Sequence, residues 1–184
     1  MIGYAAMSTS PDLPRTALSR GPCDSLTELS ARYLEEYLEK IAACLQRLDD
    51  EQVWWRPSTG NNSIGNLMLH LAGNLSLWLL NGIGGQSHER HRSQEFLADH
   101  SHSKEQLLAR LGGVVADSCD VLRGFPDDQL TAPRSNQGYW TNSLGMVFHA
   151  VEHMAYHTGQ IVAATKQLNA GKEAIEFYPQ HRGE

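Results

Sequence analysis

Three histidines recur at every fourth position near the end of the chain. His149, His153 and His157 stand in an apolar segment, 143–171, whose pattern has the period of a helix. Each helical residue advances by about 100°, so side chains four residues apart lie on one face, with Cβ atoms about 6 Å apart. Two neighbouring imidazoles of this row could bind one divalent metal ion. The spacing alone leaves open whether the pair is His149/His153 or His153/His157.

A fourth histidine of interest lies in a different apolar stretch, residues 67–80. His70 is flanked there by Leu67 and Leu71, with Asn74 one turn further along. A buried imidazole must satisfy one N–H and one lone pair, and this stretch supplies no evident partner for His70. A metal ion shared with the 149–157 row would satisfy it, whereas the alternative interpretation is a set of ordinary core histidines.

Three polar side chains are candidates for a supporting catalytic role. Glu152 is adjacent to His153 in the chain, so it points about 100° away, and it is either a base or a solvated surface residue. Asn74 could orient a ligand or line a pocket. Gln160, three positions after His157, could hydrogen-bond a bound water or a ligand imidazole. For Asn74 and Gln160, simple satisfaction of a polar group inside the protein is an equal alternative.

Amphipathic periodicity and capping signals predict four long helices to carry these residues. Ser25 with Glu28, and Ser103 with Gln106, form capping-box patterns, while Asn62 or Ser63 and Thr141 or Asn142 can cap the other two helices. The expected helices are 25–49, 62–82, 103–124 and 141–171.

Almost no strand pattern accompanies these helices, so we expect an all-α protein, an up-down four-helix bundle. The connections 82–102 and 124–141 are polar and irregular, and they leave room for crossovers or for a lid over one end. The predicted organisation is a flexible lead-in at 1–22, the bundle at 23–171 and a short tail at 172–184.

Bulk composition excludes several classes of protein. The chain of 184 residues has 15 Lys and Arg against 21 Asp and Glu, a net charge of −6, so no nucleic-acid partner is expected. The stretch 67–80 is too short and too polar to span a membrane. The three cysteines, Cys23, Cys44 and Cys119, are widely spaced and form no CxxC motif, and the N-terminal residues show no secretory pattern. We therefore expect a cytoplasmic protein.

Two segments resemble the DinB-like (DinB/YfiT-type) metalloenzyme superfamily, and within it the DUF1572-type branch. They are NSIGNLMLHLAGN at 62–74 and HAVEHMAYHTGQI at 149–161. The second segment is fairly specific, because it joins an HxxxH pair to Gly-Gln on one helix. With the matching plan of four helices, the resemblance covers roughly residues 24–170. Thr158 stands where the family often has Arg, so any ion pair of that Arg is absent here.

The resemblance implies a bundle in which the second and fourth helices supply three histidines to one divalent metal ion. Transferred residue by residue, the ligands are His70, His153 and His157, with His149 as an alternate ligand or a supporting residue one turn back. Three neutral imidazoles suit Zn or Ni best, with Fe or Mn as alternatives. The resemblance also favours a homodimer.

Such a site keeps one coordination position open, which suits activation of a water or of a thiol. The resemblance therefore implies a metal-dependent hydrolase or a thiol S-transferase that acts on a small molecule, with a low-molecular-weight thiol as a second cofactor in the latter case. The alternatives are a metal- or small-ligand-binding bundle without turnover and a stress-related scaffold whose histidines only pack.

Overall fold

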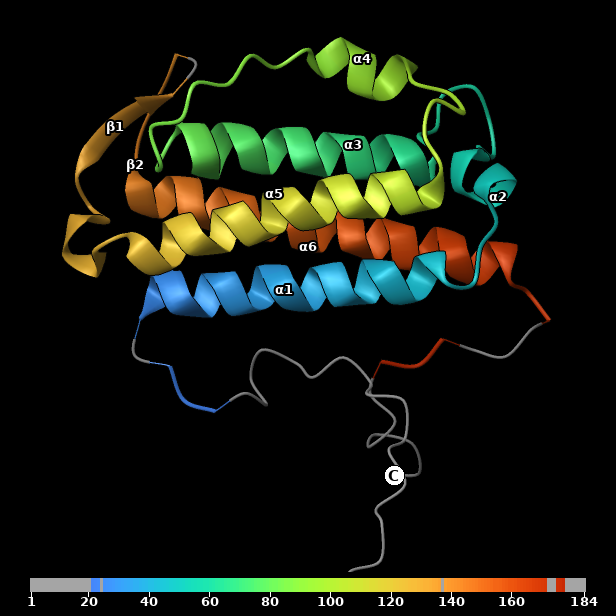
Figure 1. Ribbon diagram of the computed structural model, residues 1–184, viewed down its shortest axis with the longest axis horizontal. Coiled ribbons are helices and arrows are strands. Elements are labelled where there is room, and N and C mark those ends of the chain that lie inside the picture. Colours follow the sequence, from blue (N-terminus) through green and yellow to red (C-terminus); the bar gives the residue numbers. More distant parts are fainter. Residues whose placement is uncertain (1–20, 24, 137, 172–174, 178–184) are drawn as a thin grey trace, which may run out of the picture.

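Four long helices pack side by side in the computed structural model of the protein, which describes residues 21–23, 25–136, 138–171 and 175–177 (Figure 1). They are α1 (Leu26–Leu45), α3 (Ile64–Leu75), α5 (Lys104–Gly124) and α6 (Ser143–Leu168), and the π-helical segment η2 (Ser76–Asn81) extends α3. This confirms the predicted all-α four-helix bundle. Most of the predicted lead-in 1–22 and tail 172–184 lies outside the described residues.

Helices α3 and α5 run in the same direction, because the connection between them crosses the length of the bundle (Figure 1). Both begin beside the short helix α2 (Asp50–Trp54): Lys104 N donates to Asp50 Oδ1 at 2.7 Å, and Gly65 lies against the Trp54 ring. Helices α1 and α6 run the opposite way, which refines the predicted order to up-down-down-up. Among the four long helices, α1 packs against α5 and α6, and α3 also packs against α5 and α6.

The core is formed by leucine, isoleucine and methionine side chains from all four helices. Each fully buried side chain of this size stabilises the fold by about 1.5–3 kcal/mol. The largest fully buried ones include Leu34 and Ile41 of α1, Leu71 and Leu75 of α3, Leu107 and Leu111 of α5, and Met154 and Ile161 of α6. In the described part of the chain, no helix is both long enough and apolar enough to cross a membrane.

The predicted caps of the long helices are present. Ser25, Ser63 and Ser103 each accept a hydrogen bond from a backbone N–H in the first turn of their helix, and Asn142 does the same for α6. The first helix ends earlier than predicted, at Leu45. Asp49 instead caps α2 through a capping box with Gln52, which starts a separate helix in a new direction.

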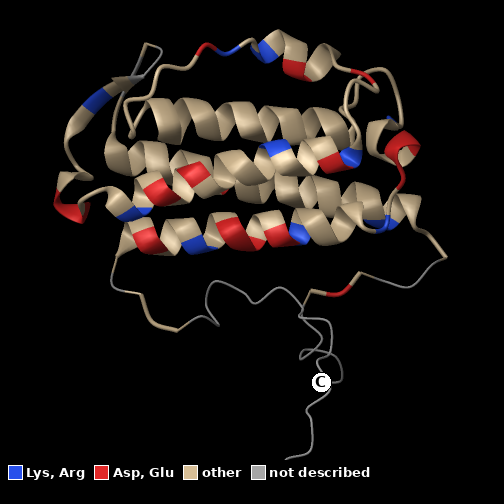
Figure 2. Ribbon diagram, in the orientation of Figure 1, with Lys and Arg blue, Asp and Glu red and all other residues tan. Residues whose placement is uncertain are grey.

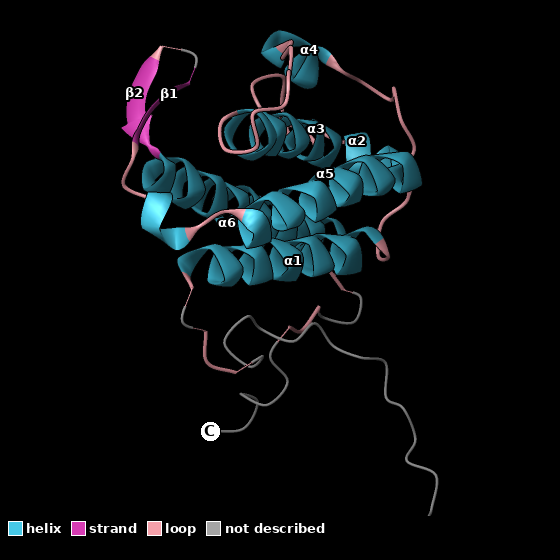
Figure 3. Cartoon of the chain, turned by 60° about the vertical axis from the view of Figure 1, so that its left-hand side comes forward, coloured by secondary structure: helices cyan, strands magenta, loops and turns pink. Residues whose placement is uncertain are grey.

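Both connections predicted to be irregular contain short regular elements. The first carries α4 (Arg92–Leu97), which lies on the outside of α3 (Figure 3). The second carries a hairpin of β1 (Pro133–Asn136) and β2 (Tyr139–Asn142), in which Gly138 has the positive φ of +83° that its turn requires. Helix α4 has no buried residue and therefore no apolar periodicity that the sequence could display.

Candidate metal centre

Three imidazoles from two helices meet at one point of the groove between α3 and α6. His70 lies on α3 and His153 and His157 on α6, and one ring nitrogen of each lies within 4.8 Å of the others. The Nε2 atoms of His70 and His153 are 2.9 Å apart. His70 and His157 are buried and His153 is half-buried. The structure therefore brings together the three residues predicted to be the ligands.

The far side of the His70 ring is held by an acid and a base from the crossover connection. His70 Nδ1 donates to Glu95 Oε2 at 2.9 Å. Arg90 clamps the same carboxylate, with Nε donating to Oε1 at 2.6 Å and Nη2 donating to Oε2 at 2.8 Å. A carboxylate only accepts, so the hydrogen bond to Glu95 requires the proton of His70 on Nδ1, although the donor Arg90 Nη2 also lies 3.0 Å from that nitrogen. In this tautomer the lone pair of Nε2 faces the other two histidines.

Burial penalises the ionised Glu95, but hydrogen bonds from Arg90 and His70 outweigh this, so the pKa of Glu95 lies below its usual value. The carboxylate is thus charged at neutral pH, as an acceptor for an imidazole N–H should be. The crossover connection thus supplies a mostly buried ion pair, Arg90 with Glu95, and this pair holds the ring of His70.

His157 is held in a similar way by its own helix. Its Nδ1 donates to Gln160 Oε1 at 2.7 Å, three residues further along α6. The Nε2 lone pair of His157 is consequently directed away from Gln160. The structure thus shows a hydrogen bond between Gln160 and the imidazole of His157, one of the predicted ligands.

All three α6 imidazoles are neutral in this environment. Burial, and then the nearby histidines, lower the pKa of His153 from its usual 6.5 to about 3. Burial also lowers the pKa of His157 and of His149. A metal ion binds the neutral imidazole, so the site holds its nitrogen donors in the protonation state that an ion requires.

His149 lies one turn away from the cluster of three. Its Nε2 accepts from Asn74 Nδ2 at 3.3 Å, and its ring packs on Trp78 and against His153 with centroids 4.7 and 5.2 Å apart. Asn74 Oδ1 is buried and has no partner among the described groups. His149 thus contacts the cluster through the ring of His153, and Asn74 leaves an acceptor available beside it.

Glu152 and Tyr156 lie on the outer side of α6. Glu152 is exposed, and Tyr156 is 60% exposed. The Tyr156 ring contacts only the edge of the site, with its centroid 5.1 Å from that of His157.

Sequence reasoning missed the residues that the crossover connection contributes. Glu95 and Arg90 were placed in a polar, irregular loop, and Phe96, whose ring centroid is 4.8 Å from that of His70, was not considered. No local pattern marks them, because their partner is 20 or more residues earlier in the chain. Asn66 fixes this connection over α3: its buried Nδ2 donates to Glu95 O and Ala98 O at 2.9 and 2.8 Å.

The donor set fits a single divalent ion. Metal–nitrogen bonds are about 2 Å long, so nitrogen atoms within 4.8 Å of one another need only small side-chain rotations to share an ion. Two of the three donors already have their other nitrogen engaged by an acceptor, the arrangement usual for metal-bound histidine. With three protein ligands, a fourth position stays open.

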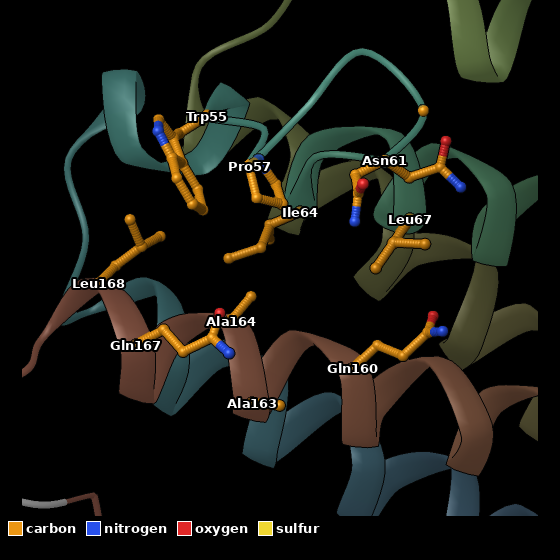
Figure 4. Close-up of a pocket in the computed structure, with 12 residues that line it drawn as sticks. Trp55, Pro57, Asn61, Ile64, Leu67, Gln160, Ala163, Ala164, Gln167 and Leu168 are labelled. Carbon is orange, nitrogen blue, oxygen red and sulfur yellow. The ribbon is translucent and has the colours of Figure 1, made fainter.

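A pocket of about 390 Å³ lies in the same groove, between the start of α3 and the C-terminal half of α6 (Figure 4). Gln160 and Leu67 lie at the end nearer to the three histidines, and Trp55 and Leu168 at the other end. A second pocket, of about 290 Å³, is lined by Glu95 and Arg90 together with His88, His91 and His102.

Comparison with known proteins gives one family and a set of similar folds. The family model described as DinB superfamily matches residues 33–161. A search of the curated proteins found no match.

Solved structures with similar folds come from several bacteria. A conserved protein from Enterococcus faecalis is 18% identical with a TM-score of 0.64, covering 78% of this chain and 97% of its own. A DinB-like protein from Bacillus cereus is 16% identical with a TM-score of 0.64, covering 81% and 97%. Another from Bacillus subtilis is 12% identical with a TM-score of 0.61, covering 80% and 96%. At these identities the likeness shows the fold.

Proposed function

Since the chain belongs to the DinB superfamily, we propose that it is a single-metal enzyme whose ion is held by His70, His153 and His157. The DUF1572-type branch stays a prediction within that superfamily. The activity we propose is attack by a metal-activated water or thiol on a small-molecule substrate, as a hydrolase or a thiol S-transferase.

One observation carries this proposal. The rings of His70 and His157 are each oriented by an acceptor on Nδ1, Glu95 in one case and Gln160 in the other. Both Nε2 lone pairs therefore face a common point, together with the half-buried His153. Any buried imidazole needs an acceptor for its N–H, but here both acceptors leave the Nε2 lone pairs converging on one point, which packing alone does not require.

The protein's own groups have distinct tasks in this scheme. Glu95, charged and clamped by Arg90, makes His70 a stronger donor and holds its plane. Asn74 offers an unpaired buried oxygen that can accept a hydrogen bond from a bound water or thiol. When bound, a divalent ion on three neutral imidazoles lowers the pKa of a water toward about 7, or binds a thiol as the thiolate.

Zn and Ni are the ions we expect, with Fe and Mn as alternatives, because imidazole nitrogen binds all of them with overlapping affinity. We place the activity in the cytoplasm, which the three unpaired cysteines Cys23, Cys44 and Cys119 support.

The first test is metal content and affinity. Protein produced without a polyhistidine tag should contain close to one divalent ion per chain by mass spectrometry, and the apoprotein should bind Zn²⁺ with one site in calorimetry. His153→Ala and His157→Ala should each lose this site. His91→Ala removes an exposed histidine of the crossover connection and should leave it unchanged.

A protein that binds no ion, or that keeps its affinity for zinc in both cluster variants, would contradict the proposal. The three histidines would then only pack, as in the scaffold considered above. Turnover separates an enzyme from a binding module: the metal-loaded protein is screened against esters, amides and electrophiles, with and without added low-molecular-weight thiols. Activity that needs the thiol identifies a transferase, and activity without it identifies a hydrolase.

A further inference from the structure

The pocket beside Trp55 is continuous along the helices with the three-histidine cluster. Leu67, in its lining, lies one turn before His70 on α3, and Gln160, also in its lining, lies one turn after His157 on α6. Gln160 belongs to both, because its Oε1 accepts from His157 Nδ1. The inner end of the pocket is therefore at Gln160, on the Nδ1 side of the His157 ring, and the candidate metal ion lies beyond that ring.

The length of the pocket suits an elongated molecule. Ala163 and Ala164 follow His157 by six and seven residues, which places them about 10 Å along the helix axis from it. Both have small side chains, and together with Ile64 and Leu67 on the facing helix they leave a channel of about 390 Å³ (Figure 4).

The chemistry of the lining is unusual for a chain with a net charge of −6. None of the described residues that line the pocket is charged. Its polar groups are four carboxamides, and the rest is apolar, ending at the 44% exposed ring of Trp55. The carboxamides are Asn61, Asn62, Gln160 and Gln167. By contrast, the second pocket includes Arg90, Glu95 and Arg110.

A carboxamide both donates and accepts hydrogen bonds, so it pairs with another amide and compensates an ion poorly. Most of the lining is exposed, so a bound group keeps part of its hydration, but an ionised group finds no charged partner here whereas a neutral amide finds both donors and acceptors. The lining therefore selects for an uncharged ligand with an apolar chain and amide-type polar groups.

We propose that this pocket, resting on the function proposed above, binds the uncharged body of the substrate, and that the substrate is a small acyl amide. Its acyl chain lies between Leu67 and Ala163, its amide groups pair with the carboxamides, and its reactive carbonyl extends past Gln160 and the His157 ring to the ion.

The pocket is tested first by itself, in metal-free protein. Suberamide, an uncharged chain with an amide at each end, is titrated while the methyl resonances of Ile64, Leu67 and Leu168 are followed by NMR. These resonances should shift with saturation, and suberate, the dianion of equal length, should require at least about a tenfold higher concentration. Equal response to both compounds, or no response at these methyls, overturns the proposal.

The link to the ion is tested in zinc-loaded protein with hydroxamates, which bind metals through a short polar head. Acetohydroxamate reports on the ion alone. The suberic monohydroxamate with a carboxamide at its far end should bind at least about tenfold more tightly, since its chain also fills the pocket. Its analogue with a far carboxylate should lose most of that gain.

Ala163→Phe should abolish the gain from the chain and leave the affinity for acetohydroxamate unchanged, because Ala163 is exposed in the pocket and away from the ligands. Ala116→Phe, at an exposed position of α5, is the matched control and should keep the gain. A gain that survives Ala163→Phe overturns the pocket. Failure of acetohydroxamate to bind overturns the metal function instead, and the suberamide titration still decides the pocket.

Discussion

At the scale of single residues, Glu95 is the side chain whose role is most directly testable. Replacing it by Gln keeps its size but removes the negative charge that accepts the hydrogen bond from His70 and pairs with Arg90. We expect Glu95→Gln to weaken Zn²⁺ binding by about 10- to 100-fold, the usual cost of losing such a partner. Competition with a chromophoric chelator measures the change in Kd.

Glu89→Gln is the control for this substitution. Glu89 lies on the same connection, and its side chain is 86% exposed, so its variant should bind zinc as the unmodified protein does. Equal affinity in Glu95→Gln and Glu89→Gln would mean that the carboxylate only anchors the connection and does not tune the site.

The buried histidines make the stability of the metal-free protein sensitive to acid. The pKa of His153 falls, through burial and then the neighbouring histidines, from 6.5 to about 3 on folding. Between these pH values the unfolded chain binds more protons than the folded one, so the free energy of unfolding decreases as the pH is lowered through this window. One such group contributes at most about 1.4 kcal/mol per pH unit, and less here because the ring is half-buried.

We therefore expect His153→Gln to flatten the dependence of unfolding free energy on pH in this window. Urea denaturation in the presence of a chelator, at a series of pH values, measures it for both proteins. The comparison isolates His153, since Glu95, whose lowered pKa also favours the folded state above its usual 4.5, is present in each. If the two plots of unfolding free energy against pH were parallel, burial of His153 would not be the cause of the acid sensitivity.

The three histidines that meet could be predicted from the sequence, whereas the groups that orient them could be predicted only in part. The four-residue row and the apolar surroundings of His70 are visible locally, but the choice of His153 and His157 over His149 and His153 came from the family resemblance. The role of Gln160 could be predicted because it lies one helical turn from its partner, His157. The role of Glu95 could not be predicted, because its hydrogen bond to His70 depends on how a polar connection folds back over α3.

At the scale of secondary structure, the contact between α2 and α3 sets where the first ligand-bearing helix begins. A Cβ placed on Gly65 would lie 2.9 Å from atoms of the Trp54 ring, which is buried and cannot move aside. We expect Gly65→Ala to destabilise the protein by about 1–3 kcal/mol through overpacking. Chemical denaturation measures the change.

Gly113→Ala is the matched control within a helix. Gly113 lies in α5, and a Cβ there meets nothing within 4 Å, so only helix propensity changes. This substitution should stabilise the protein by about 1 kcal/mol. If both variants changed stability in the same direction, packing on Trp54 would not be what requires glycine at residue 65.

The elements that the sequence could predict are those whose own residues fix them. Caps such as Ser63 and Ser103, and long apolar periodicity, define the four main helices without reference to the rest of the chain. Helix α4 and the hairpin carry no such signal. Helix α4 is held in place by Asn66 of α3, which is distant in the sequence, and the strands of the hairpin are too short to show a pattern.

At the scale of the whole molecule, charge is distributed unevenly over the bundle. Helix α1 carries many acidic and basic residues, α3 carries none, and α6 carries only Glu152 and Lys166 (Figure 2). The groove between α3 and α6 is therefore the weakly charged side of an acidic protein. This placement keeps the imidazole cluster away from the carboxylates of α1, which would otherwise compete for a cation.

The same distribution supports the predicted homodimer and identifies the face that would form it. Leu144, Phe148 and Tyr156 on the outer side of α6 are 38%, 71% and 60% exposed. Positions four apart drift by about 40°, so this row turns through about 120° from Leu144 to Tyr156, and the exposed Glu152 lies in it between Phe148 and Tyr156. Two copies of a protein with net charge −6 repel least where acidic side chains are sparse, which on α6 leaves only Glu152.

We expect the protein to be a dimer in light scattering coupled to size-exclusion chromatography, and Phe148→Glu to shift it to the monomer by placing two new carboxylates in the contact. Leu97→Glu is the control, since Leu97 is 80% exposed but lies on α4, on the far side of α3 from this row. Because Phe148 is outside the pocket and does not contact the three ligands, the monomeric variant should still bind one ion. A monomer in the unmodified protein at every concentration, or equal disruption by Leu97→Glu, would show that the exposed row serves something other than self-association.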